Sequence, residues 1–542
     1  MHMQSAQIEG FRLSPQQKRI WLLQQKEEPS PSYCVQGSFL ITGYLNVDTL
    51  KQTLQAIINR HEILRTTFQC LPGMTMPLQV IAEDYKFSIH EQSLVGLSPQ
   101  EQKSKAESLF HQLKQQTFEF VENPPFSTHV LAFSPQKHLL FIRLSALIAD
   151  GLTLAQIVNE INTLYASRSQ EKEPDNEIMQ YADVAEWQHE LLEHEEYSPG
   201  KEYWQNQSIA YSNFPDLSFL ETINKHEAFG FQLESAPVGL SSDLADKIRS
   251  LANSLKVSIR DILLSCWQIL LWRLTGQKDI TIGVASSGRA HTELAWTLGA
   301  LSKYLPLSCH LGSRLSFKQV LKNVSESVHD AYEWQDYFAW EDFTSDRKDW
   351  VPSLYPFCFE FEKWPEQYDR AGVSFSLHKR YVCREKVKIN LFCMQKGDDL
   401  GVEFSYDATL YQSDSIKNLS SWFLTLLEDA IDNPESTLSQ LRLLSEHQHQ
   451  QVLVDFNQTQ TEYPQDKCIH QVFEAQANQT PNNIAVVFED QRLTYAELNT
   501  KANQLAHYLQ ELGIANDQVV GIYLERSLEF IISLLAILKA GG

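Results

Sequence analysis

The sequence predicts a mixed α/β fold that is divided into more than one domain. Three observations lead to this: the chain has 542 residues, strand-like runs alternate with amphipathic helical runs, and one strand-turn-helix junction is especially clear. At that junction the apolar run 138–144 leads to a turn at Asp150-Gly151 and then to a helix with one apolar face. A chain of this length usually forms roughly two to four domains.

Composition excludes several classes of protein. Hydrophobic residues make up 43% of the chain, which is ordinary for a globular protein. The sequence has no apolar run long enough to span a membrane, and its first residues carry no basic stretch leading into an apolar core. We therefore expect a cytosolic (cytoplasmic) protein without a membrane partner.

The net charge and the cysteines limit the kinds of partner and metal site that we expect. The formal net charge is −23, and a phosphate-binding surface needs basic residues, so nucleic acid is not an expected partner. The eight cysteines are scattered without any Cys-x-x-Cys pair, which predicts reduced core residues rather than disulfides or metal ligands. No metal site is expected.

Local patterns in the first third predict a series of short elements. A helix begins at Ser14 with Pro15 in its first turn, and Asn46 caps a second helix that leads into the run 60–68. Within that run His61, Glu62 and Arg65 are spaced for pairing at a helix end, a structural role. The runs 127–133 and 138–144 are typical of strands.

The polar, acidic connector 167–176 is the predicted boundary between two parts of the chain. Capped helices are expected at 242–255 and 258–274, and a strand is expected from Asp279. The run 356–362 alternates apolar and polar residues, which predicts a strand with an acidic face. Later expected elements are a hairpin of strands 388–394 and 401–406 and a helix over 413–431.

The central junction resembles a motif of the condensation domains of nonribosomal peptide synthetases and, more distantly, of chloramphenicol acetyltransferase. In that family the strand-turn-helix carries two adjacent histidines, three variable residues, and then Asp-Gly. Here Asp150 and Gly151 are in register, whereas Ser145 and Ala146 stand at the two histidine positions. The chain is identified as a divergent member whose histidine pair is replaced.

Further motifs of the family occur in the same order along the chain. They are Ser14, Gln17, Arg19 and Trp21 of the opening motif, the run 60–68, Tyr181 with Asp183 and Trp187, the run 298–307, and Gln335-Asp336-Tyr337. The 298–307 run has Ser-Lys-Tyr where the family usually has Val-Asn-Thr, and the last motif lacks its leading histidine. The stretches 493–506, 519–527 and 538–542 resemble the opening segment of an adenylation domain.

The resemblance implies two acetyltransferase-like lobes, 10–175 and 176–440, opened as a V with a tunnel that passes Ser145 and Ala146. A linker at 441–465 and a truncated adenylation segment at 466–542 follow. Because the Gly-rich phosphate loop of such a domain would lie beyond Gly542, we expect this polypeptide not to activate ATP. These boundaries come from the family and not from periodicity.

The resemblance also implies the chemistry. Phosphopantetheine arms of upstream and downstream peptidyl carrier proteins would enter the tunnel, with no cofactor bound directly and an adenylation domain adjoining. Ala146 cannot act as the base that the second histidine supplies, whereas a backbone donor at Gly151 would remain. Asp150 would be a structural anchor paired with Arg289, or failing that with Arg65.

Three functions remain open at this point. The chain is a divergent enzyme that forms an amide or ester bond between carrier-bound groups, a non-catalytic platform that docks carrier proteins or a tailoring enzyme, or a domain with heterocyclisation-like chemistry. The spacing of Ser145, Asp150 and Thr153 partly fits the last. An enzyme needs a polar group at the tunnel centre, and the candidates are Ser145, Thr153, Tyr304, Glu360 and Glu362. For Ser145 a hydroxyl satisfied by backbone is the slightly favoured alternative, while Tyr304, Glu360 and Glu362 are expected at a rim or facing solvent.

Overall fold

The computed structural model divides the chain into two compact units, residues 1–449 and 450–542. Each unit is described by itself. The residues described are 10–26, 33–167, 178–193, 199–207, 214–220, 231–341, 355–364, 368–370 and 372–542. The predicted boundary connector at 167–176 lies outside this part of the chain except for Ser167, the last residue of a helix.

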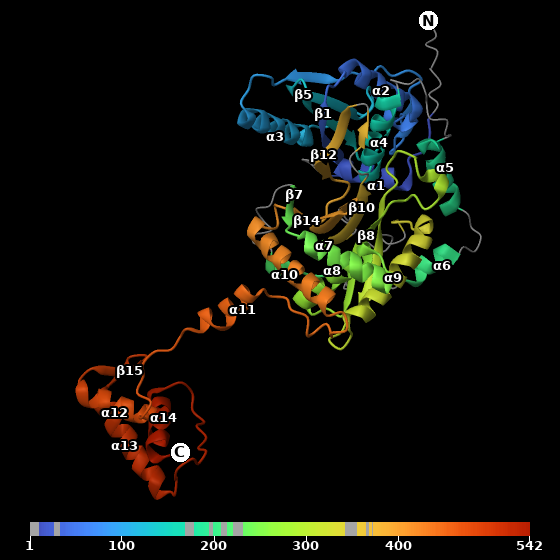
Figure 1. Cartoon of the computed structure of the whole chain (residues 1–542). Coiled ribbons are helices and arrows are strands. Elements are labelled where there is room, and N and C mark those ends of the chain that lie inside the picture. Colours follow the sequence, from blue (N-terminus) through green and yellow to red (C-terminus); the bar gives the residue numbers. More distant parts are fainter. Residues whose placement is uncertain are drawn as a thin grey trace. The chain divides into compact units, whose positions relative to one another are not determined.

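The first unit contains two six-stranded sheets (Figure 1). The first sheet has the order β11-β12-β1-β6-β5-β4. Its strands are β1 (Cys34–Gly43), β4 (His90–Ser93), β5 (Phe126–Ser134), β6 (Lys137–Ser145), β11 (Tyr368–Arg370) and β12 (Val373–Val382). A separate short hairpin pairs β2 (Thr66–Gln69) with β3 (Leu78–Ile81). The predicted strands at 127–133 and 138–144 are thereby confirmed as β5 and β6.

Helices cover both faces of the first sheet because β6 is apolar on both sides. Leu140 and Ile142 pack in the cluster formed by α2 (Val47–Arg60) and α4 (Gly151–Ser167), whereas Leu139 and Phe141 pack against α3 (Pro99–Gln115). Side chains alternate between the two faces of a strand, so a continuous apolar run is what a strand covered on both sides requires. The helices α1 (Pro15–Lys26) and α5 (Tyr181–Glu193) belong to the same unit.

The second sheet has the order β7-β14-β13-β10-β8-β9. Its strands are β7 (Leu233–Val238), β8 (Asp279–Ser286), β9 (Lys303–His310), β10 (Phe357–Trp364), β13 (Ile389–Lys396) and β14 (Asp399–Asp407). Strand β10 runs parallel to both of its neighbours, β8 and β13. The predicted hairpin is confirmed as β13 and β14, and the strand expected near 356–362 is confirmed as β10.

One face of this sheet is covered by helices, as Figure 1 shows. They are α7 (Ser242–Leu255), α8 (Ile259–Thr275), α9 (Phe317–Glu333) and α10 (Ser413–Asp432), with the short α6 (Pro199–Asn206) nearby. Phe357 and Phe359 of β10 point into this core. Glu360 therefore points to the opposite face, the one toward the first sheet. Both Glu360 and Glu362 are buried there, so the expectation that these carboxylates face solvent is wrong.

The two sheets exchange one segment. After β10 the chain enters β11 and β12, which complete the first sheet, and β12 pairs antiparallel with β1 before the chain returns to β13. The predicted lobes 10–175 and 176–440 therefore need a correction, because β11 and β12 of the second predicted lobe belong to the first sheet. Long-range pairing of this kind leaves no local pattern in the sequence. The exchange places residues of both lobes side by side at the centre of the unit.

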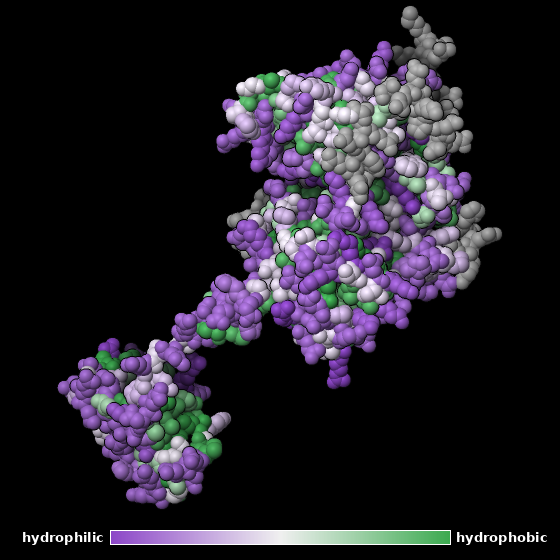
Figure 2. Space-filling view, in the orientation of Figure 1, coloured by the Kyte–Doolittle hydropathy of each residue, from purple (hydrophilic) through white to green (hydrophobic). Residues whose placement is uncertain are grey.

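The second unit holds α12 (Ile469–Gln479), the hairpin of β15 (Ile484–Phe488) and β16 (Gln491–Thr494), α13 (Tyr495–Glu511) and α14 (Leu528–Ala540). The helix α11 (Glu446–Leu453) spans the division between the units. Several large apolar side chains on this unit are exposed, among them Leu512, Val519 and Tyr523, and Figure 2 shows apolar surface here. Such a surface is one on which further protein can pack.

The structure also tests the expectations for the cysteines and for a membrane span. Six of the eight cysteines are buried and none forms a disulfide, but Cys70 and Cys468 are exposed, so the prediction of core residues is wrong for these two. Throughout the part of the chain that is described, no helix is long and apolar enough to cross a membrane.

Gly43, where β1 meets the exchanged strand, tests the sheet exchange. It has φ +110°, and a Cβ there would lie 2.1 Å from the carbonyl oxygen of Gly372. We expect Gly43→Ala to lower the free energy of unfolding by about 1–3 kcal/mol more than backbone strain alone. Gly96→Ala is the matched control, since Gly96 has φ +93° with no atom within 4 Å. Urea unfolding followed by tryptophan fluorescence measures both, and equal losses would contradict the close pairing of β1 and β12.

Candidate active site

Asp150 lies between β6 and α4 and is completely buried. Its Oδ1 atom accepts hydrogen bonds from the backbone N–H and the hydroxyl of Thr153, at 2.8 and 2.9 Å. Its Oδ2 atom accepts hydrogen bonds from the backbone N–H of Ser302 at 2.9 Å and from the Ser302 hydroxyl at 2.7 Å. Asp150 thus caps the N-terminus of α4 and also holds the segment before β9.

Arg289 completes the surroundings of this carboxylate. Its Nη1 lies 2.8 Å from Asp150 Oδ2 and its Nη2 lies 3.3 Å from Oδ1, so the predicted ion pair is present. Burial alone would raise the pKa of Asp150, but the charge of Arg289 and the hydrogen bonds from Arg289 and Ser302 outweigh it and hold the pKa well below its ordinary value. Arg65, the alternative partner, instead pairs with Glu62 at 3.2 Å.

Ser145 and Ala146 do not face a tunnel. Both residues are fully buried, and neither lines any of the three cavities described below. The Ser145 hydroxyl accepts the backbone N–H of Leu147 at 3.2 Å, while the N–H of Ala146 donates to the carbonyl of Tyr33. The turn after β6 lies at 146–148, earlier than the predicted Asp150-Gly151. The prediction of a tunnel past these two residues is therefore wrong, and the Ser145 hydroxyl is satisfied by backbone.

Gly151 is covered by an ion pair from the other elements. A Cβ at this position would lie 2.1 Å from Glu362 Oε1 and 2.6 Å from Arg380 Nη2, so only glycine leaves room for them. Glu362 and Arg380 are 2.6 Å apart, and Glu362 Oε2 accepts a hydrogen bond from the Trp364 indole at 2.9 Å. Burial chiefly raises the pKa of Glu362, against the opposing charge of Arg380. A carboxylate therefore occupies the space in front of the α4 N-terminus.

A second ion pair lies beside the first. Glu360 Oε1 is 3.0 Å from Arg384 Nη2, and the amide of Asn390 lies 3.4 Å from Glu360 Oε2. Arg384 also donates through Nη1 to the carbonyl oxygen of Ser302 at 3.0 Å. Since Ser302 is held by Asp150, this arrangement connects the buried anchor to the Glu360 carboxylate. Burial would lower the pKa of Arg384, but the charge of Glu360 and its neighbours raises it, so the guanidinium stays charged.

Two cavities of the first unit meet at these residues. One, of about 170 Å³, is lined by residues from α3, β12 and the second sheet, among them Phe110, Glu360 and Arg380. The other, of about 70 Å³, is lined by α1 and by residues such as Ser302, Phe338 and Trp340. Tyr304, Arg384 and Glu385 line both cavities and so stand between them.

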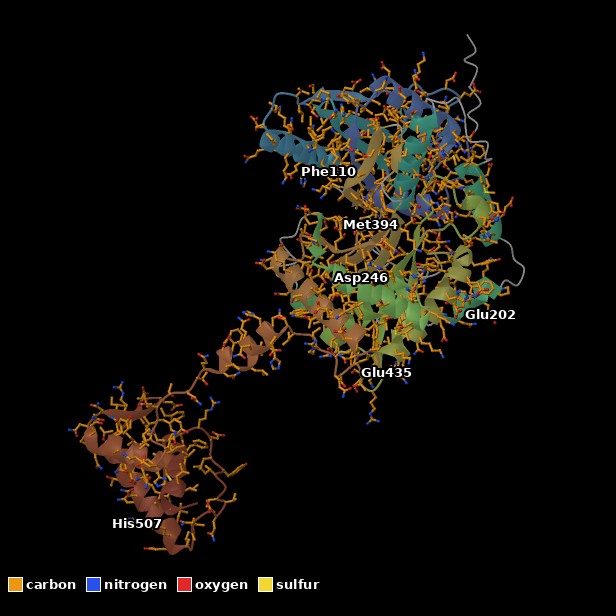
Figure 3. All side chains as sticks on the ribbon, viewed as in Figure 1. Phe110, Glu202, Asp246, Met394, Glu435 and His507 are labelled. Atoms are coloured by element: carbon orange, nitrogen blue, oxygen red, sulfur yellow. The ribbon has the colours of Figure 1, made fainter. Side chains whose placement is uncertain are left out.

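The region between the two sheets can be seen in the figures. The surface is notched between the two sheets and their helices (Figure 2). Phe110 lies on the side of the first sheet, across from the second sheet, which carries Met394 (Figure 3). Of the predicted tunnel residues, Tyr304 and Glu360 line the cavities, whereas Thr153 is buried, with its hydroxyl 2.9 Å from both Asp150 Oδ1 and the Gly299 carbonyl oxygen. A third cavity, of about 330 Å³, lies between α3 and the first sheet.

Motifs far apart in the sequence come together around this centre. The Ser14 hydroxyl bonds the Tyr181 hydroxyl at 2.7 Å, and Tyr181 donates to the carbonyl of Ala300 at 3.0 Å. Gln17 donates to the Leu147 carbonyl at 3.0 Å. At the end of α2, His61 contacts buried Glu160 at 2.9 Å. The His61 contact agrees with the structural role predicted for the run 60–68, and Ser14 and Gln17 of the opening motif make structural contacts as well.

Three residues of the site were missed from the sequence: Ser302, Arg380 and Arg384. The sequence held a signal for the two arginines. Glu360 and Glu362 occupy one face of a strand, and buried carboxylates need cationic partners. The charged run 379–386 was the natural source of those partners. Among the described residues, no group of three or more His, Cys, Asp or Glu side chains is arranged to hold a metal ion.

Comparison with known proteins gives a consistent result. A family profile described as "Condensation domain" matches residues 8–453, and one described as "AMP-binding enzyme" matches residues 473–542. Bacitracin synthase 2 of Bacillus licheniformis is 31% identical over 538 residues, which cover 98% of this chain and 20% of that protein. The chain therefore spans about a fifth of that relative's length.

Solved structures agree on the fold. A four-domain nonribosomal peptide synthetase, holo-AB3403 bound to AMP and glycine, matches with a TM-score of 0.73 and 16% identity, over 99% of this chain and 42% of that one. The X-domain in complex with OxyB from teicoplanin biosynthesis matches with a TM-score of 0.65 and 18% identity, over 81% of this chain and 97% of that one. The predicted α/β fold, with the start of an adenylation-type segment after it, is confirmed.

Replacing Asp150 should cost far more stability than replacing an acidic residue of a more open ion pair. Asp150→Ala leaves Arg289 buried without its partner, so we expect a loss of about 3–5 kcal/mol in the free energy of unfolding. Glu62→Ala is the comparison, because Glu62 is partly exposed in its pair with Arg65 and should cost about 0–1 kcal/mol. All 11 tryptophans lie in the first unit, so tryptophan fluorescence in urea reports this unit alone. Similar losses for both variants would contradict the anchoring role.

Ser145→Ala should destabilise the first unit modestly. The change leaves the buried N–H of Leu147 without its hydroxyl acceptor, which we expect to cost about 1–3 kcal/mol. Ser254→Ala serves as control, because the Ser254 hydroxyl lies on an exposed helix and its loss should stay within about 0.5 kcal/mol. If Ser145→Ala proves neutral in the same urea titration, the hydroxyl has no such capping role.

Proposed function

The chain belongs to the condensation-domain family of nonribosomal peptide synthetases, and on this premise we propose that it joins acyl and aminoacyl groups carried on two peptidyl carrier proteins. The product bond is an amide or an ester, and the phosphopantetheine arms belong to the carriers. The start of an AMP-binding domain follows in the same chain, so the adjoining adenylation domain is one of the proposed partners. Family membership gives the class of reaction, while activity of this chain is the proposal.

One observation carries the proposal. Two cavities lie next to each other between the lobes, and Tyr304, Arg384 and Glu385 line both of them. A reaction between two tethered groups needs two entrances that meet, and the two adjoining cavities are the candidates for them. Lys114, His111 and Lys379 at the larger cavity would also favour the phosphate of an incoming arm.

Loss of the histidine pair lowers the expected rate without removing the reaction. A missing general base typically costs about 10²–10⁴-fold in rate. An amine is a better nucleophile than a hydroxyl, and holding two reactants in position can supply a large part of the acceleration. Ser145 and Ala146 contribute no reacting group, since both are buried and away from the cavities described.

A non-catalytic platform is the second candidate, and one observation favours it. The Glu362–Arg380 pair covers Gly151, which closes the position where the family's motif would meet its substrate. The similar X-domain structure contains a partner, OxyB, which fits a condensation fold used for docking. Heterocyclisation-like chemistry finds no support, because the Thr153 hydroxyl is buried between Asp150 and Gly299.

Reconstitution distinguishes the two candidates. The full chain is mixed with one carrier protein bearing an acyl thioester and another bearing an aminoacyl thioester, and intact-protein mass spectrometry follows the carriers. We expect the acyl mass to move onto the aminoacyl carrier and to be absent when the chain is omitted. Ser145→Ala should retain product formation within about twofold, because its hydroxyl lies away from both cavities.

Carrier binding completes this test. If the wild type binds carrier protein in a titration but forms no condensed product with any loaded pair, the enzymatic proposal is wrong and the platform function replaces it. A chain that neither condenses nor binds carriers contradicts both candidates.

A further inference from the structure

We propose that Glu360 and Arg384 form the reacting centre of this domain, with Arg384 binding the thioester carbonyl oxygen and Glu360 accepting the amine proton. The inference rests on the proposed condensation function and places the chemistry on β10 and the segment after β12. The motif strand β6 then provides support and no reacting group.

Location is the first argument. Arg384 lines both cavities, and Glu360 lines the larger one, so groups arriving through the two entrances reach this pair. Both side chains are more than nine-tenths buried, with relative exposures of 9% for Arg384 and 6% for Glu360. A buried ion pair that borders two cavities can form strong interactions with a ligand, because little water competes there.

Orientation is the second argument. The Arg384 guanidinium is fixed on one side by the Ser302 carbonyl at 3.0 Å and on the other by Glu360 at 3.0 Å. Ser302 is in turn fixed by two hydrogen bonds to Asp150. Asp150 is accordingly a positioning residue for Arg384. A donor held in place before the reaction stabilises a developing oxyanion without the cost of reorganisation.

The bond-forming step balances with these two groups. The amine nitrogen attacks the thioester carbon, the C–N bond forms, and the negative oxygen of the tetrahedral intermediate lies against Arg384. Glu360 takes the proton that the nitrogen loses. The C–S bond then breaks, and the departing thiolate receives that proton, so that thioester and amine become amide and thiol. No oxidant, metal or further reactant enters.

Neighbouring charged groups are less suitable for these roles. Glu362 is held by Arg380 and the Trp364 indole against Gly151, and it does not line either of the two cavities. Glu403 also lines the larger cavity, from β14, but it is Glu360 that contacts Arg384, at 3.0 Å, and Arg384 lines both cavities. The only cation that lines both cavities and contacts Glu360, among the described residues, is Arg384.

Glu360→Gln tests the inference because it keeps the shape of the side chain and removes its ability to accept a proton. In the loaded-carrier assay we expect the single-turnover rate to fall about 10²–10⁴-fold, with binding of both carriers unchanged. Asp429→Asn is the matched control: Asp429 is a buried carboxylate on α10, outside the cleft, where it pairs with Arg442, and its removal should leave the rate within twofold.

A second variant guards against misfolding. Glu360→Gln leaves Arg384 buried without a counter-charge, so the double variant Glu360→Gln with Arg384→Gln removes both charges and should fold where the single one fails. Its rate should be as low as that of the single variant. A wild-type rate in either folded variant overturns the inference while leaving the condensation function in place. Absence of product from the wild type overturns the proposed function, and this inference with it.

Discussion

The structure of the first unit depends on the buried ion pair between Asp150 and Arg289. Asp150 belongs to the start of α4 in the first lobe, and Arg289 follows β8 in the second, so the pair fixes one lobe against the other. Both partners are fully engaged: the carboxylate accepts four further hydrogen bonds from Thr153 and Ser302, and the guanidinium also donates to the Thr297 carbonyl. A buried charge of this kind is tolerated only when every polar atom has a partner.

The Asp150–Arg289 pair determines how the residues of the cleft are arranged. Asp150 holds Ser302, Ser302 holds Arg384, and Arg384 meets Glu360 on β10. The exchange of β12 into the first sheet is what brings Arg380 and the nearby Arg384 over the second sheet. Geometry at the cavities thus depends on Asp150, a residue that lines neither of them and whose role is structural.

Much of the fold could be predicted from the sequence, because apolar runs and helix caps are local features. The β6 to α4 junction, α7, α8 and the β13–β14 hairpin are examples. The Asp150–Arg289 pair came from family resemblance. Long-range contacts could not be predicted. Alternation along β10 shows that Glu360 and Glu362 share a face, but it does not show whether that face meets solvent or the other lobe. The pairing of β1 with β12 and the inward burial of Ser145 likewise depend on contacts that no local pattern encodes.

Buried charges between the lobes bear on function as well as on folding. Ion pairs away from water contribute little net stability compared with well-packed apolar side chains, since desolvation offsets most of their attraction. Two such pairs, Glu362–Arg380 and Glu360–Arg384, nevertheless fill the face of β10 that looks toward the first sheet. The Glu362–Arg380 pair closes the position in front of Gly151, and the Glu360–Arg384 pair borders both cavities. Charged groups that cost stability and border cavities are typical of sites that bind or transform a ligand. A domain that only docked partners on its outer surface would gain more from an apolar interior at this place.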